Sequence, residues 1–136
     1  MDEQPGLSDE YRTASPWPLF VALGFAVLEV GVFLGAFPVA VAGVVLFGGS
    51  VTGILRESGY VTRTWGVLAA LGAAFGLLGG ALVATQVAPG GVDPVAVVAD
   101  PNGVVGRGLA VVVGGVMLVA AAVAGGVAGR SEGRGV

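Results

Sequence analysis

Residues 19–55 decide the fold, and they read LFVALGFAVLEVGVFLGAFPVAVAGVVLFGGSVTGIL. A single charged residue, Glu29, interrupts this apolar run. As one helix the run would extend about 55 Å, whereas the hydrocarbon core of a bilayer is about 30 Å thick. Because proline suits the first turn of a helix, we divide the run at Phe37-Pro38 into spans Leu19–Phe37 and Pro38–Leu55, joined as a tight hairpin. One long kinked helix is the alternative.

Two further apolar segments, Trp65–Ala88 and Gly108–Gly129, are also long enough to cross a bilayer. Apolar and polar residues do not alternate in them, which disfavours the strands of a membrane barrel. A lone span in lipid must pair its own backbone groups, and only a helix does so. We therefore predict an all-α fold: an integral membrane four-helix bundle of two hairpins within residues 18–130. An acidic mobile arm (residues 1–17) precedes the bundle, and a short polar tail (residues 131–136) follows it.

The composition supports a protein in lipid and narrows its chemistry. Of 136 residues, 11% are charged and 55% are hydrophobic, and the mean hydropathy is +0.93. A soluble domain carries about 25% charged residues, so the composition disfavours a water-soluble globule, a disordered chain and a nucleic-acid binder. The chain has no histidine and no cysteine, and it therefore cannot supply imidazole or thiolate ligands to haem, copper or zinc. We expect no catalytic residue, no cofactor and no metal.

The segment from residue 89 to residue 107 is predicted to be a loop outside the membrane. Asp100-Pro101-Asn102-Gly103 is a turn signal, and Pro94 to Ala99 is expected to form a short turn of helix. A calcium loop needs more oxygen ligands at closer spacing than Asp93 and Asp100 provide. We interpret these two aspartates as turn and cap residues.

Arginines are unevenly distributed between the two sides of a four-span protein. The N-terminal arm, the 56–64 loop and the C-terminal tail share one side, and they contain Arg12, Arg56, Arg63, Arg130 and Arg134. The other side contains only Arg107. The positive-inside rule then predicts a multi-pass protein of the cell membrane with both termini cytoplasmic. The acidic N-terminus does not have the pattern of a signal peptide, and Trp17 and Trp65 are placed as interfacial anchors.

Small residues recur at four-residue steps in every span. In lipid, close packing rather than the hydrophobic effect associates helices, and small residues permit it. The candidate packing positions are Gly31, Gly35, Gly49, Gly53, Gly72, Gly76, Gly80, Ala121, Gly125 and Gly129. Packing within the chain is the favoured interpretation, and a face for another subunit, including a homo-oligomer, is the alternative.

Glu29 is the candidate functional residue, because it lies near the middle of the first predicted span. A charge there costs roughly 2.5–3.5 kcal/mol on insertion scales, and burial disfavours the charged form. Glu29 shares one helical stripe with Phe25 and Phe33. No basic residue lies within a predicted span, so no buried ion pair within the chain is evident. The candidate neutral partners are Ser50, Thr52, Thr85 and Gln86.

Three roles for Glu29 remain open. It could be a protonated residue that bonds across helices, a contact to a partner protein, or a proton or cation site. Arg56, Glu57 and Tyr60 follow the second span and are candidate loop or partner contacts. Ordinary anchoring of Arg56 at the membrane edge is favoured over docking.

Two strings resemble a known family: Ser15-Pro16-Trp17-Pro18-Leu19-Phe20 and Ile54-Leu55-Arg56-Glu57-Ser58-Gly59-Tyr60. With the acidic start, they resemble small membrane proteins of halophilic archaea called cox cluster proteins, which are encoded beside haem-copper terminal oxidases. The resemblance covers residues 1–60 best and brings no catalytic residues. It implies a non-catalytic accessory subunit or assembly factor of a respiratory oxidase, with oxidase subunits as partners.

Two alternatives remain beside the accessory role. Four spans with one glutamate in the first resemble small multidrug-resistance exporters, in which case Glu29 would couple proton or cation movement. Against this, few aromatic residues are present to line a cation site: 2 Trp, 2 Tyr and 6 Phe. The other alternative is a structural membrane protein that associates with itself through its glycine faces.

Overall fold

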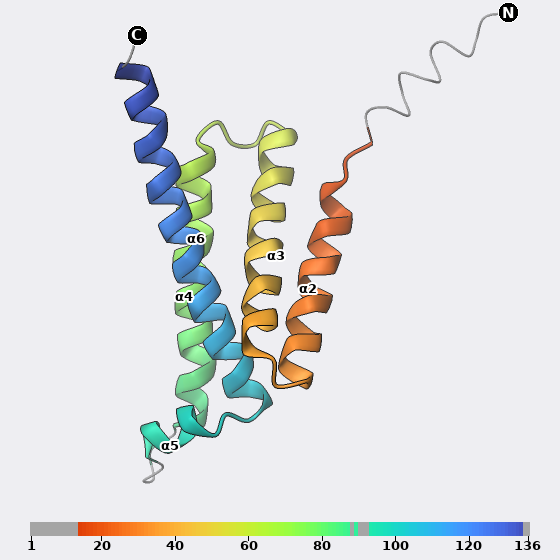
Figure 1. Cartoon of the computed structure of the whole chain (residues 1–136), viewed down its shortest axis with the longest axis vertical. Coiled ribbons are helices and arrows are strands. Elements are labelled where there is room, and N and C mark those ends of the chain that lie inside the picture. The colour runs from red at the N-terminus through yellow and green to blue at the C-terminus, as the bar shows by residue number, and fades with distance from the viewer. Residues whose placement is uncertain (1–13, 88, 90–92, 135–136) are drawn as a thin grey trace, which may run out of the picture.

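The computed structural model describes residues 14–87, 89 and 93–134, and within these ranges every regular element is a helix. The elements are α2 (Trp17–Phe33), α3 (Phe37–Glu57), α4 (Thr64–Gln86), α5 (Pro94–Ala99) and α6 (Gly103–Arg134) (Figure 1). The all-α prediction is therefore confirmed for the described chain. Most of the predicted acidic arm, residues 1–13, lies outside the described residues.

The first hairpin turns earlier than the predicted division at Phe37-Pro38. Helix α2 ends at Phe33, and α3 already begins at Phe37 with Pro38 in its first turn. Gly35 adopts a φ of 69°, a left-handed conformation that glycine reaches without steric cost. The Ala36 N–H donates to the Gly31 carbonyl at 2.8 Å, and the Gly35 N–H donates to that of Val32. This pair of bonds is a Schellman motif that ends α2, so the long-kinked-helix alternative is wrong.

The second hairpin contains the longest helix. Helix α6 runs from Gly103 to Arg134, 32 residues, and so extends beyond the predicted span Gly108–Gly129 at both ends. Its start is capped by Asn102, whose Oδ1 accepts from the Val104 and Val105 N–H groups at 2.9 Å each. The predicted helical turn Pro94–Ala99 is confirmed as α5, and Asp93 caps it by accepting from the Val95 N–H.

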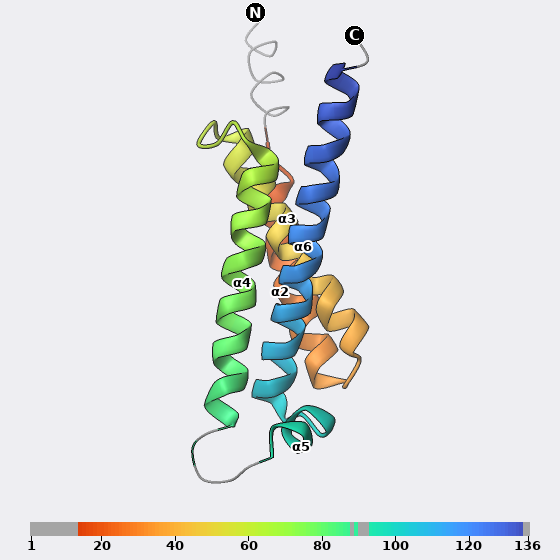
Figure 2. The same cartoon turned by 90° about the vertical axis from the view of Figure 1, so that its left-hand side faces the viewer.

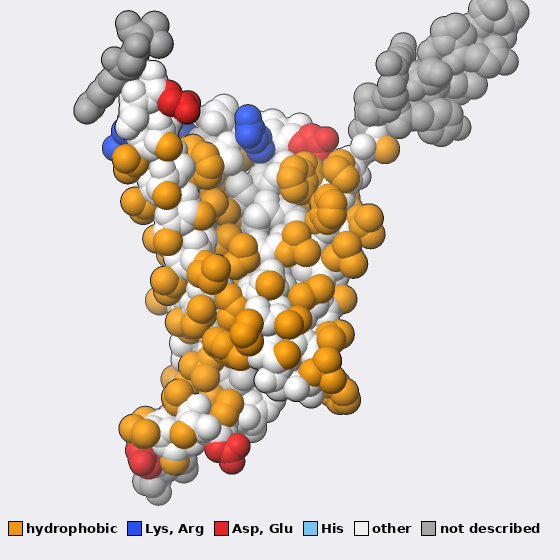
Figure 3. Space-filling view, in the orientation of Figure 1, with side chains coloured by type: hydrophobic (Ala, Val, Ile, Leu, Met, Phe, Trp, Pro, Cys, Tyr) orange, Lys and Arg blue, Asp and Glu red, His pale blue; other side chains and the backbone are white. Residues whose placement is uncertain are grey.

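Three helices are long and apolar enough to cross a membrane by length and composition: α3, α4 and α6. Helix α2 is also apolar but has 17 residues, about 26 Å at 1.5 Å per residue. Hydrophobic side chains cover the flanks of the molecule, and the charged side chains visible on this face lie at its two ends (Figure 3).

The four long helices associate as two pairs. Helix α2 packs along α3 and α4 packs along α6, while α3 and α6 form the main junction between the pairs (Figures 1 and 2). At this junction Val44 lies against Gly114, where an added Cβ would come within 2.6 Å of the Val44 Cβ. Buried residues form two clusters. The cluster at this junction consists of Ala40, Val41, Val44 and Ala110, and the cluster between α4 and α6 consists of Leu68, Leu118 and Ala122.

Glycines form the close contacts within each pair of helices. Along a helix these contacting glycines recur every seven residues, instead of the predicted four. A Cβ on Gly72 would lie 2.5 Å from the Gly115 carbonyl oxygen, and a Cβ on Gly24 would lie 2.9 Å from that of Gly43. Helices that keep one seam facing a partner through a left-handed crossing repeat every seven residues. A residue four positions further along the helix no longer faces the partner, so the predicted four-residue pattern does not trace the contact.

The predicted packing positions consequently separate into two groups. Four lie against a neighbouring helix: Gly31, Gly53, Gly72 and Gly125. An added Cβ would meet no described atom within 4 Å at five others: Gly35, Gly49, Gly76, Gly80 and Gly129. Ala121 is exposed, and its neighbour Ala122 is the buried one. Whether the open glycines form a face for another subunit stays a prediction.

The two pairs repeat one motif, Trp-x6-Gly-x6-Gly. It occurs at Trp17, Gly24 and Gly31 in α2 and at Trp65, Gly72 and Gly79 in α4. In each pair the tryptophan ring covers a glycine near the end of the second helix, at Gly53 for Trp17 and at Gly125 for Trp65. The chain is thus built from two similar helical hairpins.

Candidate functional site

An ion pair between Glu29 of α2 and Arg107 of α6 joins the two hairpins. The Arg107 Nε donates to Glu29 Oε1 at 2.9 Å and to Oε2 at 3.0 Å, and Nη2 also donates to Oε2. Arg107 Nη1 donates to the Gly103 carbonyl at 3.0 Å, which fixes the guanidinium over the first turn of α6. This fork geometry is the strong form of an arginine–carboxylate contact.

The ion pair corrects two expectations about Glu29. Because α2 ends at Phe33, Glu29 lies one turn from the helix end instead of mid-span. Because α6 begins at Gly103, Arg107 lies inside a helix instead of closing a loop. The sequence interpretation therefore missed this partly exposed ion pair, because it placed Arg107 in the loop before the fourth span. A reading of Asn102-Gly103 as a helix start would have placed Arg107 on the first turns of α6.

The neutral side chains proposed as partners of Glu29 bond elsewhere. Ser50 and Thr52 donate to carbonyls of their own helix, those of Leu46 and Gly48, at 2.6 and 3.0 Å. Thr85 donates to the Leu82 carbonyl. The last of the set, Gln86, accepts from Asn102 Nδ2 at 2.9 Å, which ties the end of α4 to the start of α6.

The electrostatics of both helix ends favour pairing. Glu29 is near the C-terminus of α2, where the helix dipole disfavours an anion, and Arg107 is near the N-terminus of α6, where it disfavours a cation. Each charge offsets the unfavourable position of the other. The site is open, because the side chains of Arg107 and Glu29 remain 43% and 32% exposed, and Phe33 beside them is 88% exposed.

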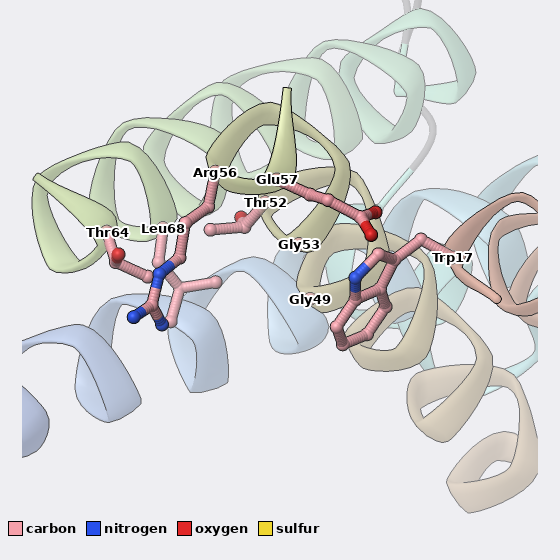
Figure 4. A pocket seen from close by; sticks show the side chains of 8 residues that line it. All are labelled: Trp17, Gly49, Thr52, Gly53, Arg56, Glu57, Thr64 and Leu68. Atoms are coloured by element: carbon pink, nitrogen blue, oxygen red, sulfur yellow. The ribbon is translucent and has the colours of Figure 1, made fainter. Parts of the chain in front are cut away.

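A second polar site lies where α2 begins and α3 ends (Figure 4). Ser15 Oγ donates to Glu57 Oε2, and the Trp17 ring lies on Gly53. Trp17, Gly53, Glu57 and Arg56 border a cavity of about 480 Å³. In Figure 4 Glu57 points toward Trp17, whereas Arg56 runs past Thr64 toward the α6 ribbon.

The third residue of the predicted contact set, Tyr60, does not line this cavity. It is 82% exposed in the turn before α4. Gly59 supplies the left-handed residue of that turn with a φ of 78°. Of the three predicted contact residues, Arg56 and Glu57 therefore line the cavity and Tyr60 is exposed beside it.

No group of three or more acidic side chains that could hold a metal ion occurs among the residues that the structure describes. Asp93 acts as the N-cap of α5, and Asp100 is the residue at its C-terminal end. Both positions agree with their interpretation as cap and turn residues.

The fold and its charges are those of a helical membrane protein: three long apolar helices, a shorter fourth, and polar groups near the helix ends. Residues 1–128 match the model of a family of unknown function, DUF7541, and the chain belongs to this family. Comparisons with curated proteins and with solved structures find no match.

Proposed function

We propose that this chain is a four-span protein of the cell membrane with both termini in the cytoplasm. Three arginines, Arg56, Arg63 and Arg130, border a single pocket and therefore lie at one end of the molecule. Arg107 lies near the opposite end, at the start of α6 (Figure 1). This separation supports the orientation expected from the positive-inside rule.

Reporter fusions test the orientation. A reporter fused after Val136 should be accessible only from the cytoplasm, and one inserted in the 89–93 segment only from outside. The reverse pattern would overturn the proposed orientation, and accessibility of both reporters from the same side would overturn the four-span topology.

We further propose a non-catalytic role as an accessory subunit or assembly factor of a haem-copper terminal oxidase. One observation carries this proposal: the two strings that resemble the cox cluster proteins meet, because Ser15 of the first donates a hydrogen bond to Glu57 of the second. The Trp17 ring of the first string also covers Gly53, the residue just before the second string. Together they form one surface at the proposed cytoplasmic end. Without histidine, the chain can assist an oxidase but cannot ligate its haem or copper.

The exposed part of this surface is the proposed contact for the oxidase. Tyr60 protrudes from the turn after α3, and Arg56 borders the adjoining cavity. Tyrosine and arginine are enriched among the residues that dominate protein interfaces. Tyr60 is well suited to a test because its side chain supports no helix packing.

A mild-detergent pull-down from native membranes, read by mass spectrometry and haem absorbance, tests the role. Oxidase subunits should be recovered with the wild-type chain and with Phe33→Ala, an exposed aromatic at the opposite end. Recovery should fall at least about tenfold with Tyr60→Ala, the loss expected when one interface hot spot is removed. Recovery of the chain without oxidase subunits would overturn the accessory role.

The transporter alternative has less support. A proton-coupling carboxylate must be able to bind and release protons, whereas Glu29 is held by three hydrogen bonds from Arg107. Substrate flux in proteoliposomes that disappears in Glu29→Gln, while the protein stays folded, would favour the transporter over the accessory role.

A further inference from the structure

A basic pocket lies where α3 and α6 end and α4 begins. It has a volume of about 710 Å³, and its polar lining comprises Arg56, Arg63, Arg130, Thr62 and Thr64. These residues come from three separate segments that only the tertiary fold brings together. The pocket adjoins the cavity of Figure 4, with which it shares Arg56 and Thr64.

The charge of this pocket is unbalanced. It has three guanidinium groups, and no carboxylate is among the side chains that line it. Within the described ranges, none of the three arginines forms an ion pair. The ion pair found there joins Arg107 to Glu29. Arginine presents a planar fork of donors that fits phosphate oxygens, and threonine hydroxyls can add further donors. The ligand chemistry that fits is therefore a phosphate anion.

The residues around the pocket indicate whether such a phosphate would belong to a lipid headgroup or to a free phosphate ion. Trp65 lines it, and tryptophan is typical of the headgroup level of a membrane. Val127 and Val123 lie on the same face of α6 as Arg130, nearer the middle of the helix, and they are 55% and 60% exposed. A phosphate seated among the arginines would thus continue into an apolar track that suits an acyl chain.

We propose that this pocket binds the headgroup phosphate of an anionic phospholipid, with the acyl chains along α6. Basic pockets between transmembrane helices on the cytoplasmic side are known to hold such headgroups. The proposal does not depend on the oxidase role, and it requires no partner protein.

Native mass spectrometry of the full chain in detergent tests the proposal. Phosphatidylglycerol and phosphatidylcholine with identical acyl chains are titrated in parallel, and phosphatidylglycerol should be retained preferentially. Each arginine near an anionic headgroup contributes about fivefold in binding. The preference should therefore fall about fivefold in Arg130→Gln and about thirtyfold in Arg56→Gln/Arg130→Gln.

Two controls separate this site from general electrostatics and from free phosphate. Arg107→Gln removes one positive charge at the opposite end of the molecule, in the first turns of α6, and it should change the preference less than twofold. Millimolar inorganic phosphate should not displace the lipid, because it lacks the acyl chains. Equal retention of the two lipids, an equal effect of Arg107→Gln, or displacement by phosphate would each overturn the lipid assignment. Circular dichroism verifies that every variant is folded.

Discussion

Gly79 of α4 and Gly108 of α6 approach each other backbone to backbone. A Cβ added to Gly79 would lie 2.5 Å from the Gly108 carbonyl oxygen, and one added to Gly108 would lie 2.8 Å from that of Gly79. Real side chains do not tolerate such distances, so both positions require glycine at this separation of the helices. Because lipid offers helices no hydrophobic drive to associate, this close contact is a main source of their attraction.

The first prediction compares two adjacent glycines of α4. Gly79→Leu should destabilise the protein by about 2–3 kcal/mol, because the new side chain meets backbone atoms that cannot move without displacing α6. Gly80→Leu should have little effect, since nothing in the described chain lies within 4 Å of its Cβ position. Thermal unfolding in detergent, followed by circular dichroism, measures both. Equal melting temperatures for the two variants would contradict the seven-residue seam.

The second prediction concerns the ion pair between the hairpins. Glu29→Gln and Arg107→Gln should each lower the free energy of unfolding by about 1 kcal/mol. This value lies between those of a surface ion pair and a buried one, because the site is partly exposed. Glu29→Gln/Arg107→Gln should cost less than the sum of the two single changes, since no charge then remains unpaired. A double-mutant cycle in nanodiscs measures this coupling, and strict additivity would argue that the pair does not join the hairpins.

The third prediction uses the tryptophan that covers α6. Gly125→Leu should displace the Trp65 ring, whose Cζ2 lies 2.6 Å from the Cβ position of that glycine. The fluorescence maximum of Trp65 should shift in a Trp17→Phe background, in which Trp65 is the sole tryptophan. Gly129→Leu, one turn further along α6, is the matched control, because the structure places no described atom within 4 Å of its Cβ position. Similar spectra for both variants would contradict the packing of Trp65 on Gly125.

The fourth prediction concerns the start of α6. Asn102→Ala should destabilise the protein by about 1 kcal/mol, since two backbone N–H groups lose their acceptor. Asn102→Asp keeps that acceptor and adds a charge that the helix N-terminus favours, so its melting temperature should stay close to that of the wild type. Equal losses in the two variants would instead assign the effect to the bond between Asn102 and Gln86.

Features that depend on local chemistry were predictable. The apolar segments form helices, Pro94–Ala99 forms its turn, and Asp93 caps it, because each depends on residues adjacent in the chain. Helix ends were less predictable. The division at Phe37-Pro38 considered only where proline could start a helix, whereas the Schellman motif at Gly35 ends α2 at Phe33, four residues before Phe37.

The faces that helices present to one another could not be obtained from spacing alone. Gly72 and Gly76 share a four-residue pattern, yet a Cβ would meet α6 only at Gly72. The seam between α4 and α6 repeats at every seventh position, at Gly72 and Gly79, and such a seam is a property of the pair of helices. The repeated motif Trp-x6-Gly-x6-Gly was present in the sequence as a signal for this arrangement.

By itself, the sequence determined that the chain is helical and apolar enough for lipid, because hydrophobicity and backbone pairing are settled residue by residue within each segment. Only the tertiary structure decided that Glu29 pairs with Arg107, 78 positions away, and that three arginines from separate segments border one pocket. Those contacts depend on where helices end and how they cross, and both are set by packing between segments that are distant in the chain.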